Sequence, residues 1–285
     1  MATAPVLLVA RQALPHGELV TLTLNRPHKL NSLTADLISA LVAAIDKESA
    51  AAAAPSAEGG GTCLPRVLAI CGAGRGFSAG VDLTAATSLF SMEAEDASGA
   101  FPRLFDVPAA LRACPWPVLA LVHGACYTGA LEIALCADVL LATPDALFAD
   151  THAGVGIAPS WGLSQRLQRR IGIHRALEMS LTATPIDAAR ADSWGLCNRV
   201  VPSGDLHAEA VAMATNILEA WAPMVRGYKR TARDGSELAL GPALRLEREH
   251  ALRYYQHMAA EDDAYGRLMR FLATKKGRGA ARARL

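Results

Sequence analysis

The chain has 285 residues, 52% of them hydrophobic and 19% charged, which is typical of a globular protein with a large core and excludes a disordered chain. Its 28 basic and 27 acidic residues give a formal net charge of +1, so we expect no nucleic-acid partner. No apolar run approaches the roughly 18 residues of a membrane span, and the six cysteines form no CxxC pair, which favours reduced core cysteines in an intracellular protein over a disulfide framework or a zinc site.

Strands and helices are predicted to alternate over residues 18–200. Residues 18–24 alternate apolar residues with threonines, the period of a half-buried strand. Thr34 is a good N-cap for a helix whose apolar residues recur at helical spacing. Three β-branched-rich runs predict strands covered on both faces, at 66–71, 117–122 and 138–142. The alternation predicts an α/β layered core with parallel strands.

Strand patterns cease after about Pro202, and the rest of the chain is predicted to be helical. The predicted helices are 204–221, 223–233, 241–260 and 261–273. This shift predicts an α/β core domain at 1–202, a helical C-terminal region at 203–274 and a basic tail at 275–285.

The tail, KKGRGAARARL, has five basic residues, no acid, and ends in Ala283-Arg284-Leu285. This ending has the small-basic-leucine form of the Ser-Lys-Leu peroxisomal address. We therefore expect a peroxisomal or glycosomal location, with the mitochondrion or the cytoplasm as alternatives; a solvated tail that happens to end in leucine is the other interpretation.

Residues 72–83, GAGRGFSAGVDL, permit three functional interpretations. A dinucleotide-binding GxGxxG fingerprint fails at Phe77, which stands where the third glycine belongs. GFSAG matches the GxSxG nucleophile pattern around Ser78, with an aspartate and then His152 following in the order that hydrolases use. In the third interpretation the glycines let the backbone approach a ligand, so that an N–H group around Val81 becomes a fixed hydrogen-bond donor. An ordinary glycine turn is the remaining alternative.

The segment Gly124–Asp138, GACYTGALEIALCAD, combines a glycine-rich turn with an apolar helix. Gly129 begins the helical pattern, and the unpaired N–H groups of a helix N-terminus stabilise an anionic oxygen. Glu132 lies one turn further on and is the single charged residue before Asp138. Desolvation raises the pKa of a carboxyl group, and a carboxyl that titrates near neutrality passes protons in either direction. Alternatively, Glu132 faces solvent or pairs with an arginine.

Five ordered blocks give the chain a resemblance to the enoyl-CoA hydratase/isomerase, or crotonase, superfamily over nearly its whole length. The blocks are VTLTLNRPHKLNSL (20–33), GRGFSAGVDL (74–83), PVLALVHGACYTGALEIALCAD (117–138), ALFADTHAGVGIAPSWGLSQRL (146–167) and LTATPIDAARADSWGLCNRVVP (181–202). The resemblance implies a repeated ββα core, a helical C-terminal region that assembles a homotrimer or hexamer, and an acyl-CoA ligand. It also implies that the backbone N–H groups of Val81 and Gly129 stabilise a thioester enolate.

The resemblance places Glu132 where hydratases of this family carry the first of two catalytic glutamates. The second glutamate is absent, because Phe148-Ala149-Asp150-Thr151-His152 puts His152 at its position. An imidazole titrates at about pH 6.5 and can orient water or shuttle a proton, although a plain structural histidine is the alternative. Ser160 stands where dienoyl-CoA isomerases carry an aspartate, which disfavours that activity.

We expect Asp150 to orient His152, since alternate residues of a strand share a side. The resemblance further implies that Lys29 contacts the CoA phosphates and that Ala79, Gly80 and Asp82 bind substrate. The expected activity is enoyl-CoA hydration with no metal and no cofactor beyond the CoA of the substrate. The alternatives are enoyl-CoA isomerisation on the same fold and a non-catalytic acyl-CoA-binding subunit.

Overall fold

A computed structural model describes residues 4–52, 64–84 and 106–258, together with the single positions 266, 269 and 272. The chain forms two compact units, residues 1–225 and 226–285. Part of the predicted helix at 261–273 and the whole tail at 275–285, with its Ala283-Arg284-Leu285 ending, lie outside the described residues.

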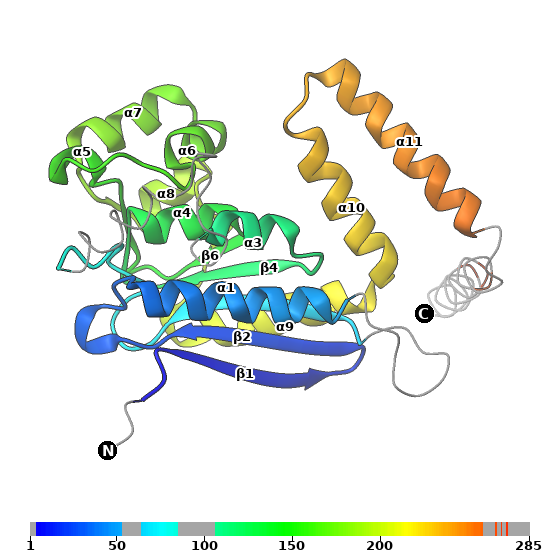
Figure 1. The fold of residues 1–285 in the computed structure, drawn as a ribbon, viewed down its shortest axis with the longest axis horizontal. Helices are drawn as coiled ribbons and strands as arrows, with labels where there is room; N and C mark the ends of the chain where they lie inside the picture. Colours follow the sequence, from blue (N-terminus) through cyan, green and yellow to red (C-terminus); the bar gives the residue numbers. More distant parts are fainter. Residues whose placement is uncertain are drawn as a thin grey trace, which may run out of the picture. The chain divides into compact units, whose positions relative to one another are not determined.

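The first unit is built on a six-stranded sheet with the strand order β1-β2-β3-β4-β6-β9 (Figure 1). Strand β1 is antiparallel to β2, and the strands from β2 to β9 are parallel to one another. Their bounds are β1 Leu7–Leu14, β2 Gly17–Leu24, β3 Arg66–Gly72, β4 Val118–Val122, β6 Val139–Ala142 and β9 Arg199–Val200. The predicted parallel α/β core is confirmed, and the strands predicted at 18–24, 66–71, 117–122 and 138–142 are β2, β3, β4 and β6.

Both faces of the sheet are covered, as the continuous apolar runs predicted. In β4, Val118, Ala120 and Val122 pack in one hydrophobic cluster, whereas Leu119 and Leu121 pack in a second one. The first cluster lies under α1 (Ala35–Ala50), α3 (Val107–Ala113) and α4 (Gly129–Cys136), and the second lies under α9 (Leu206–Glu219). Figure 1 shows α1 and α9 on opposite faces of the sheet.

Helix α1 begins where its cap was predicted. The Thr34 hydroxyl accepts a hydrogen bond from the Leu37 N–H group at 3.4 Å, which satisfies one of the free donors of the first turn. The predicted apolar stripe is fully buried: Leu37, Ile38, Leu41, Val42 and Ile45. Burial of this stripe against β2 and α3 holds the helix on the sheet.

A second, three-stranded sheet has the order β5-β7-β8 and positions the site. Strands β5 (Ala125–Tyr127) and β7 (Leu147–Ala149) are parallel, and β8 (Ile186–Asp187) is antiparallel to β7. Helix α4 follows β5, and the short helix α5 (His152–Val155) follows β7. The carboxyl ends of two paired parallel strands therefore bring the start of α4 close to the start of α5.

The remaining helices of this layer are α6 (Leu163–Ile171), α7 (Ile173–Thr182) and α8 (Ala188–Trp194), and the short 3-10 helices are η1 (Pro27–Lys29) and η4 (Ser203–Asp205).

In the described residues after Pro202, up to Met258, the C-terminal region is helical, as predicted. It contains α10 (Ala222–Gly235) and α11 (Leu240–Met258), which are joined by a hydrogen bond between the Thr231 hydroxyl and the His250 ring at 2.7 Å. Helix α9 packs with the sheet, so the first compact unit extends to Val225, further than the predicted core domain of 1–202. The assembly of this region into a trimer stays a prediction.

The described cysteines form no disulfide, as the spacing of the cysteines predicted. Cys71, Cys114, Cys126, Cys136 and Cys197 are all free thiols, and all but Cys71 are buried. Within the described ranges, no helix is both long and apolar enough to cross a membrane.

Candidate active site

Three segments lie side by side beyond the carboxyl ends of the parallel strands: residues 78–82, 125–129 and 147–152. The Ser78 N–H group donates to the Ala125 carbonyl at 2.9 Å, and the Tyr127 N–H group donates back to the Ser78 carbonyl at 3.1 Å. On the other side of β5, the Thr128 N–H group donates to the Ala149 carbonyl at 2.9 Å. These bonds make β5 the centre of the site.

Gly80 allows the first two segments to approach closely. Its φ of +88° lies in the left-handed region, and a Cβ at this position would lie 2.3 Å from the Thr128 hydroxyl oxygen and 2.8 Å from the Tyr127 carbonyl oxygen. Glycine is therefore required here for both conformation and space. Thr128 itself has a φ of 46°, an uncommon value for a β-branched residue that turns the chain from β5 into α4.

Two backbone donors result from this arrangement. Neither the Val81 N–H group nor the Gly129 N–H group donates to any residue within the described ranges. The two residues are neighbours, since a Cβ built on Gly129 would lie 3.5 Å from Cγ2 of Val81. A pair of unpaired N–H groups, one of them at a helix N-terminus, can hold an oxygen that becomes negatively charged.

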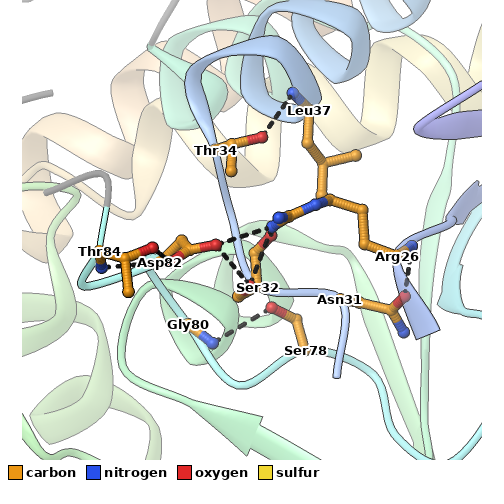
Figure 2. Close-up of polar contacts among 9 residues, drawn as sticks. All are labelled: Arg26, Asn31, Ser32, Thr34, Leu37, Ser78, Gly80, Asp82 and Thr84. Atoms are coloured by element: carbon orange, nitrogen blue, oxygen red, sulfur yellow. Dashed lines mark hydrogen bonds and ion pairs between the residues drawn. The ribbon is translucent and has the colours of Figure 1, made fainter. Parts of the chain in front are cut away.

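A polar network holds the loop that carries Val81 (Figure 2). One Asp82 carboxylate oxygen accepts from the Thr84 hydroxyl at 2.6 Å, and the other faces the Arg26 guanidinium at 3.1 Å and the Ser32 hydroxyl at 3.2 Å. Hydrogen bonding to Thr84, and then to Arg26 and Ser32, lowers the pKa of Asp82 to about 2. The network thus fixes the residue next to Val81.

Asn31 holds the same loop through a second set of hydrogen bonds. It is fully buried with a φ of 53°, and its amide donates to the carbonyl oxygens of Ala73 and Gly76 at 2.8 Å each. Its side-chain oxygen accepts from the Arg26 N–H group at 2.8 Å, as Figure 2 shows. Asn31 therefore joins the loop after β2 to the loop after β3.

Glu132 is the acid of the site. It lies on α4, a helix in which nearly every residue is buried, and is only 2% exposed. Its Oε1 accepts from the Trp161 N–H group at 2.9 Å and the Leu163 N–H group at 3.0 Å, so backbone groups and not a cation hold it. Burial raises the pKa of Glu132 despite these bonds and despite the nearby His152, which lower it. The alternative in which Glu132 faces solvent or pairs with an arginine is wrong.

His152 lies close enough to Glu132 for its charge to act on that carboxyl group. The imidazole is buried, and its Nδ1 lies 2.7 Å from Oδ1 of Asp150. The contact predicted between Asp150 and His152 is confirmed, but for a different reason. Strand β7 ends at Ala149, and Asp150 accepts from the His152 N–H group at 3.1 Å, which makes a turn that folds the ring back onto the carboxylate.

The structure places the other predicted residues at the edges of this site. Lys29 is exposed in η1, and its contact with CoA phosphate stays a prediction. The Ala79 N–H group donates to the Leu30 carbonyl and the Gly80 N–H group to the Ser78 hydroxyl, so both are engaged within the protein. Asp82 is likewise held by protein groups, and direct substrate contacts by these three residues stay predictions.

The hydrolase interpretation of Ser78 fails on geometry. Ser78 is fully buried, and its hydroxyl oxygen accepts from the Gly80 N–H group. A catalytic triad needs a hydrogen bond between the serine hydroxyl and the histidine ring, and none joins Ser78 to His152. Within the described ranges, no group of three His, Cys, Asp or Glu residues is arranged to hold a metal ion; the expectation of a metal-free reaction stays a prediction.

Sequence reasoning missed the residues that act through others. Arg26 and Asn31 hold the Val81 loop, the N–H groups of Trp161 and Leu163 hold Glu132, and Ser180 donates to Asp150 at 2.6 Å. Arg26 and Asn31 lie in the first block of the resemblance, and this is the one signal that pointed to them. Backbone donors leave no signal in residue types.

Comparisons with known proteins agree with the geometry. The family model described as enoyl-CoA hydratase/isomerase matches residues 16–276. The chain is 37% identical over 264 residues to the probable enoyl-CoA hydratase 1, peroxisomal, of Arabidopsis thaliana, which covers 92% of this chain and 91% of that protein. It is 31% identical over 231 residues to a crotonyl-CoA hydratase of Syntrophomonas wolfei, covering 81% and 84% of the two chains. A crystal structure of an enoyl-CoA hydratase from Bacillus anthracis superposes with a TM-score of 0.75 at 27% identity, covering 93% and 95%. The chain belongs to the enoyl-CoA hydratase/isomerase family, the crotonase superfamily.

Proposed function

We propose that the protein is an enoyl-CoA hydratase, which adds water across the 2,3 double bond of a trans-2-enoyl-CoA thioester. The observation that carries this proposal is Glu132, a buried carboxyl group with a raised pKa, three residues along α4 from the unpaired N–H group of Gly129. Family membership and the hydratase names of the relatives support the same reaction.

The two backbone donors act on the thioester oxygen. When the oxygen of water bonds to C3, the electron pair of the double bond moves to the thioester carbonyl, whose oxygen gains negative charge. The N–H groups of Val81 and Gly129 stabilise this enolate, and each such donor contributes about 3 kcal/mol of barrier lowering. Because the donors are fixed by Gly80 and the Asp82 network, no reorganisation is needed as the charge develops.

Glu132 and His152 handle the protons. Attack of water at C3 releases one proton and C2 takes one up, so the site needs a proton acceptor and a proton donor. Glu132 is the principal acid/base, because its raised pKa lets it hold and release a proton closer to neutrality than an exposed glutamate. His152 takes the position of the second acid/base group and orients water or transfers the second proton.

Substrate binding, assembly and location complete the proposal. Lys29 contacts the CoA phosphates from the loop after β2. No metal or redox cofactor takes part, because the two backbone N–H groups stabilise the enolate. The protein is a homotrimer, or a hexamer formed by two such trimers. It acts in the peroxisome, for which the peroxisomal name of the Arabidopsis thaliana relative is the support.

The test of this function is turnover of crotonyl-CoA by the purified protein, followed at the absorbance of the enoyl thioester and by mass spectrometry of the product. We expect the absorbance to disappear and the product to gain the mass of one water. A product of unchanged mass with a shifted double bond would assign isomerase activity instead. Binding of crotonyl-CoA without any turnover would indicate a non-catalytic binding subunit.

A further inference from the structure

The carboxylate of Asp150 is fully engaged on both oxygens, although it lies in the interior. Asp150 is 3% exposed. Its Oδ1 accepts from the backbone N–H group of His152 at 3.1 Å and lies 2.7 Å from Nδ1 of the same residue. Its Oδ2 accepts from the hydroxyl of Ser180 at 2.6 Å. Ser180 comes from α7, so a separate helix fixes the carboxylate that contacts the histidine.

The charge state of Asp150 decides which ring nitrogen of His152 carries a proton. Burial alone would raise the pKa of Asp150, but the hydrogen bonds from His152 and Ser180 outweigh it and lower the pKa. Asp150 is therefore ionised at neutral pH and can only accept hydrogen bonds. Nδ1 of His152 must then be the donor, which leaves the lone pair of the neutral ring on Nε2.

The other charged groups around the Ser180–Asp150–His152 chain interact with other residues. On α7, Glu178 is exposed and lies 4.0 Å from Arg190, and Arg175 stacks over the Trp194 ring. Glu132 from α4 is the remaining acid that interacts electrostatically with His152. The hydrogen-bond chain Ser180–Asp150–His152 thus ends beside the principal acid/base of the site.

We propose that Asp150 and Ser180 are positioning residues that hold His152 as the Nδ1–H tautomer, with Nε2 accepting the proton that the attacking water releases while Glu132 delivers a proton to C2. This inference rests on the proposed function for the proton transfer, whereas the tautomer itself does not. A histidine with a fixed carboxylate partner gains orientation and basicity that a lone imidazole lacks. This provides the physical reason why a histidine can serve at a position where hydratases of this family carry a glutamate.

The test combines a spectroscopic and a kinetic measurement on the full chain. In protein labelled with ¹⁵N-histidine, the His152 signals are assigned by their loss in His152→Gln, and the nitrogen shifts report which ring nitrogen is protonated. We expect Nδ1 to be protonated in the wild type. We expect Asp150→Asn to lose this preference, because a carboxamide can donate as well as accept. Its kcat for crotonyl-CoA hydration should fall about 10–100-fold with little change in KM.

Matched controls separate positioning from a loss of structure. Ser180→Ala should lower kcat by less than Asp150→Asn does, because the carboxylate keeps its bonds to His152. Asp187→Asn changes an exposed aspartate that caps α8, and Ser193→Ala removes an exposed hydroxyl on α8; both should leave the tautomer and kcat unchanged.

The outcomes distinguish this inference from the proposed function. Protonation of Nε2 in the wild type, or an Asp150→Asn variant with unchanged tautomer and unchanged kcat, would overturn the inference. A wild-type protein that shows the Nδ1–H tautomer but does not hydrate crotonyl-CoA would refute the proposed function and leave the positioning of His152 standing.

Discussion

Two buried glutamates of the first unit, Glu48 and Glu132, are equally inaccessible at 2% exposure but have opposite surroundings. Glu48 lies at the end of α1, near the amino ends of the parallel strands, and is paired with the guanidinium groups of Arg11 and Arg66. Glu132 lies beyond the carboxyl ends of the same strands and is held by two backbone N–H groups. Two arginines pair with the first glutamate, whereas burial raises the pKa of the second.

The cluster around Glu48 extends the contrast. Glu18 on β2 contacts Arg11 at 2.7 Å and Arg66 at 2.6 Å, so two acids and two arginines join β1, β2, β3 and α1. Opposite charges balance there, and removal of one partner leaves an uncompensated charge in the interior. Around Glu132 the charged neighbours are Asp150 and His152, and no arginine within the described ranges pairs with the carboxylate. This difference assigns a structural role to Glu48 and an acid/base role to Glu132.

The largest expected effect comes from Glu132→Gln. The substituted side chain keeps an oxygen that accepts from Trp161 and Leu163 but can neither accept nor donate the reacting proton. We expect kcat for crotonyl-CoA hydration to fall by about 10²–10⁴-fold, with the Kd of the CoA ester nearly unchanged. Stopped-flow kinetics and calorimetric binding measure the two quantities, and an unchanged kcat would remove Glu132 from the reaction.

Glu48→Gln should give the opposite result. It leaves Arg11 and Arg66 with one acid, Glu18, in place of two. We therefore expect the free energy of unfolding to fall by about 2 kcal/mol, measured by denaturant titration. The kcat of the protein that remains folded should stay within about twofold of the wild type, since the cluster lies away from the site. A large loss of kcat in the folded fraction would contradict the division between the two glutamates.

Gly80→Ala tests the fixed geometry of the N–H pair. The new Cβ would collide with the Thr128 hydroxyl and the Tyr127 carbonyl, which pushes apart the segments that carry Val81 and Gly129. We expect kcat to fall by about 10²-fold, the cost of losing one such donor. Gly204→Ala is the control, because a Cβ there meets nothing within 4 Å; equal activities of the two variants would show that the close approach is not required.

Asp82→Asn should have the smallest effect. We expect it to change how the free energy of unfolding depends on pH. The pKa of Asp82 is lowered to about 2 in the folded protein, so its contribution is present above the unfolded value of about 3.9 and is lost as the pH falls towards 2. We expect the variant to be less stable by about 1 kcal/mol or less at pH 7 and less sensitive to acid between pH 4 and pH 2. Parallel acid-dependent unfolding curves for variant and wild type would contradict this assignment.

The sequence predicted the parts of the fold that rest on buried apolar patterns. Strands β2, β3, β4 and β6 and helix α1 each bury a regular set of side chains, and their periodicity is visible in the residues. Strand β1 was not predicted, because it is an edge strand whose residues are mostly exposed, so hydrophobic alternation does not mark it. The three-residue strands β5 and β7 are too short for any period to show.

In the site, the side chains with a conspicuous sequence context could be predicted, whereas the backbone groups that hold them could not. Glu132 was found because a charge in an apolar helix is conspicuous, and Gly80 lies in a glycine pattern. The partners of Glu132 were not predictable, since any residue at 161 and 163 supplies a backbone N–H group. Ser180 is far from Asp150 in the chain, and only the packing of α7 brings the two together. Asp150 and His152 were paired correctly, but by strand alternation where the chain in fact makes a turn.

The central claim is that Glu132 holds a proton at a higher pH than an ordinary glutamate. It is tested most directly by ¹³C NMR of the glutamate side-chain carboxyl carbons during a pH titration, with the Glu132 signal assigned by its absence in Glu132→Gln. We predict that this signal titrates above the ordinary glutamate value of about 4.3. A midpoint at or below that value would contradict the account, because an acid so easily ionised would behave like the paired, structural kind.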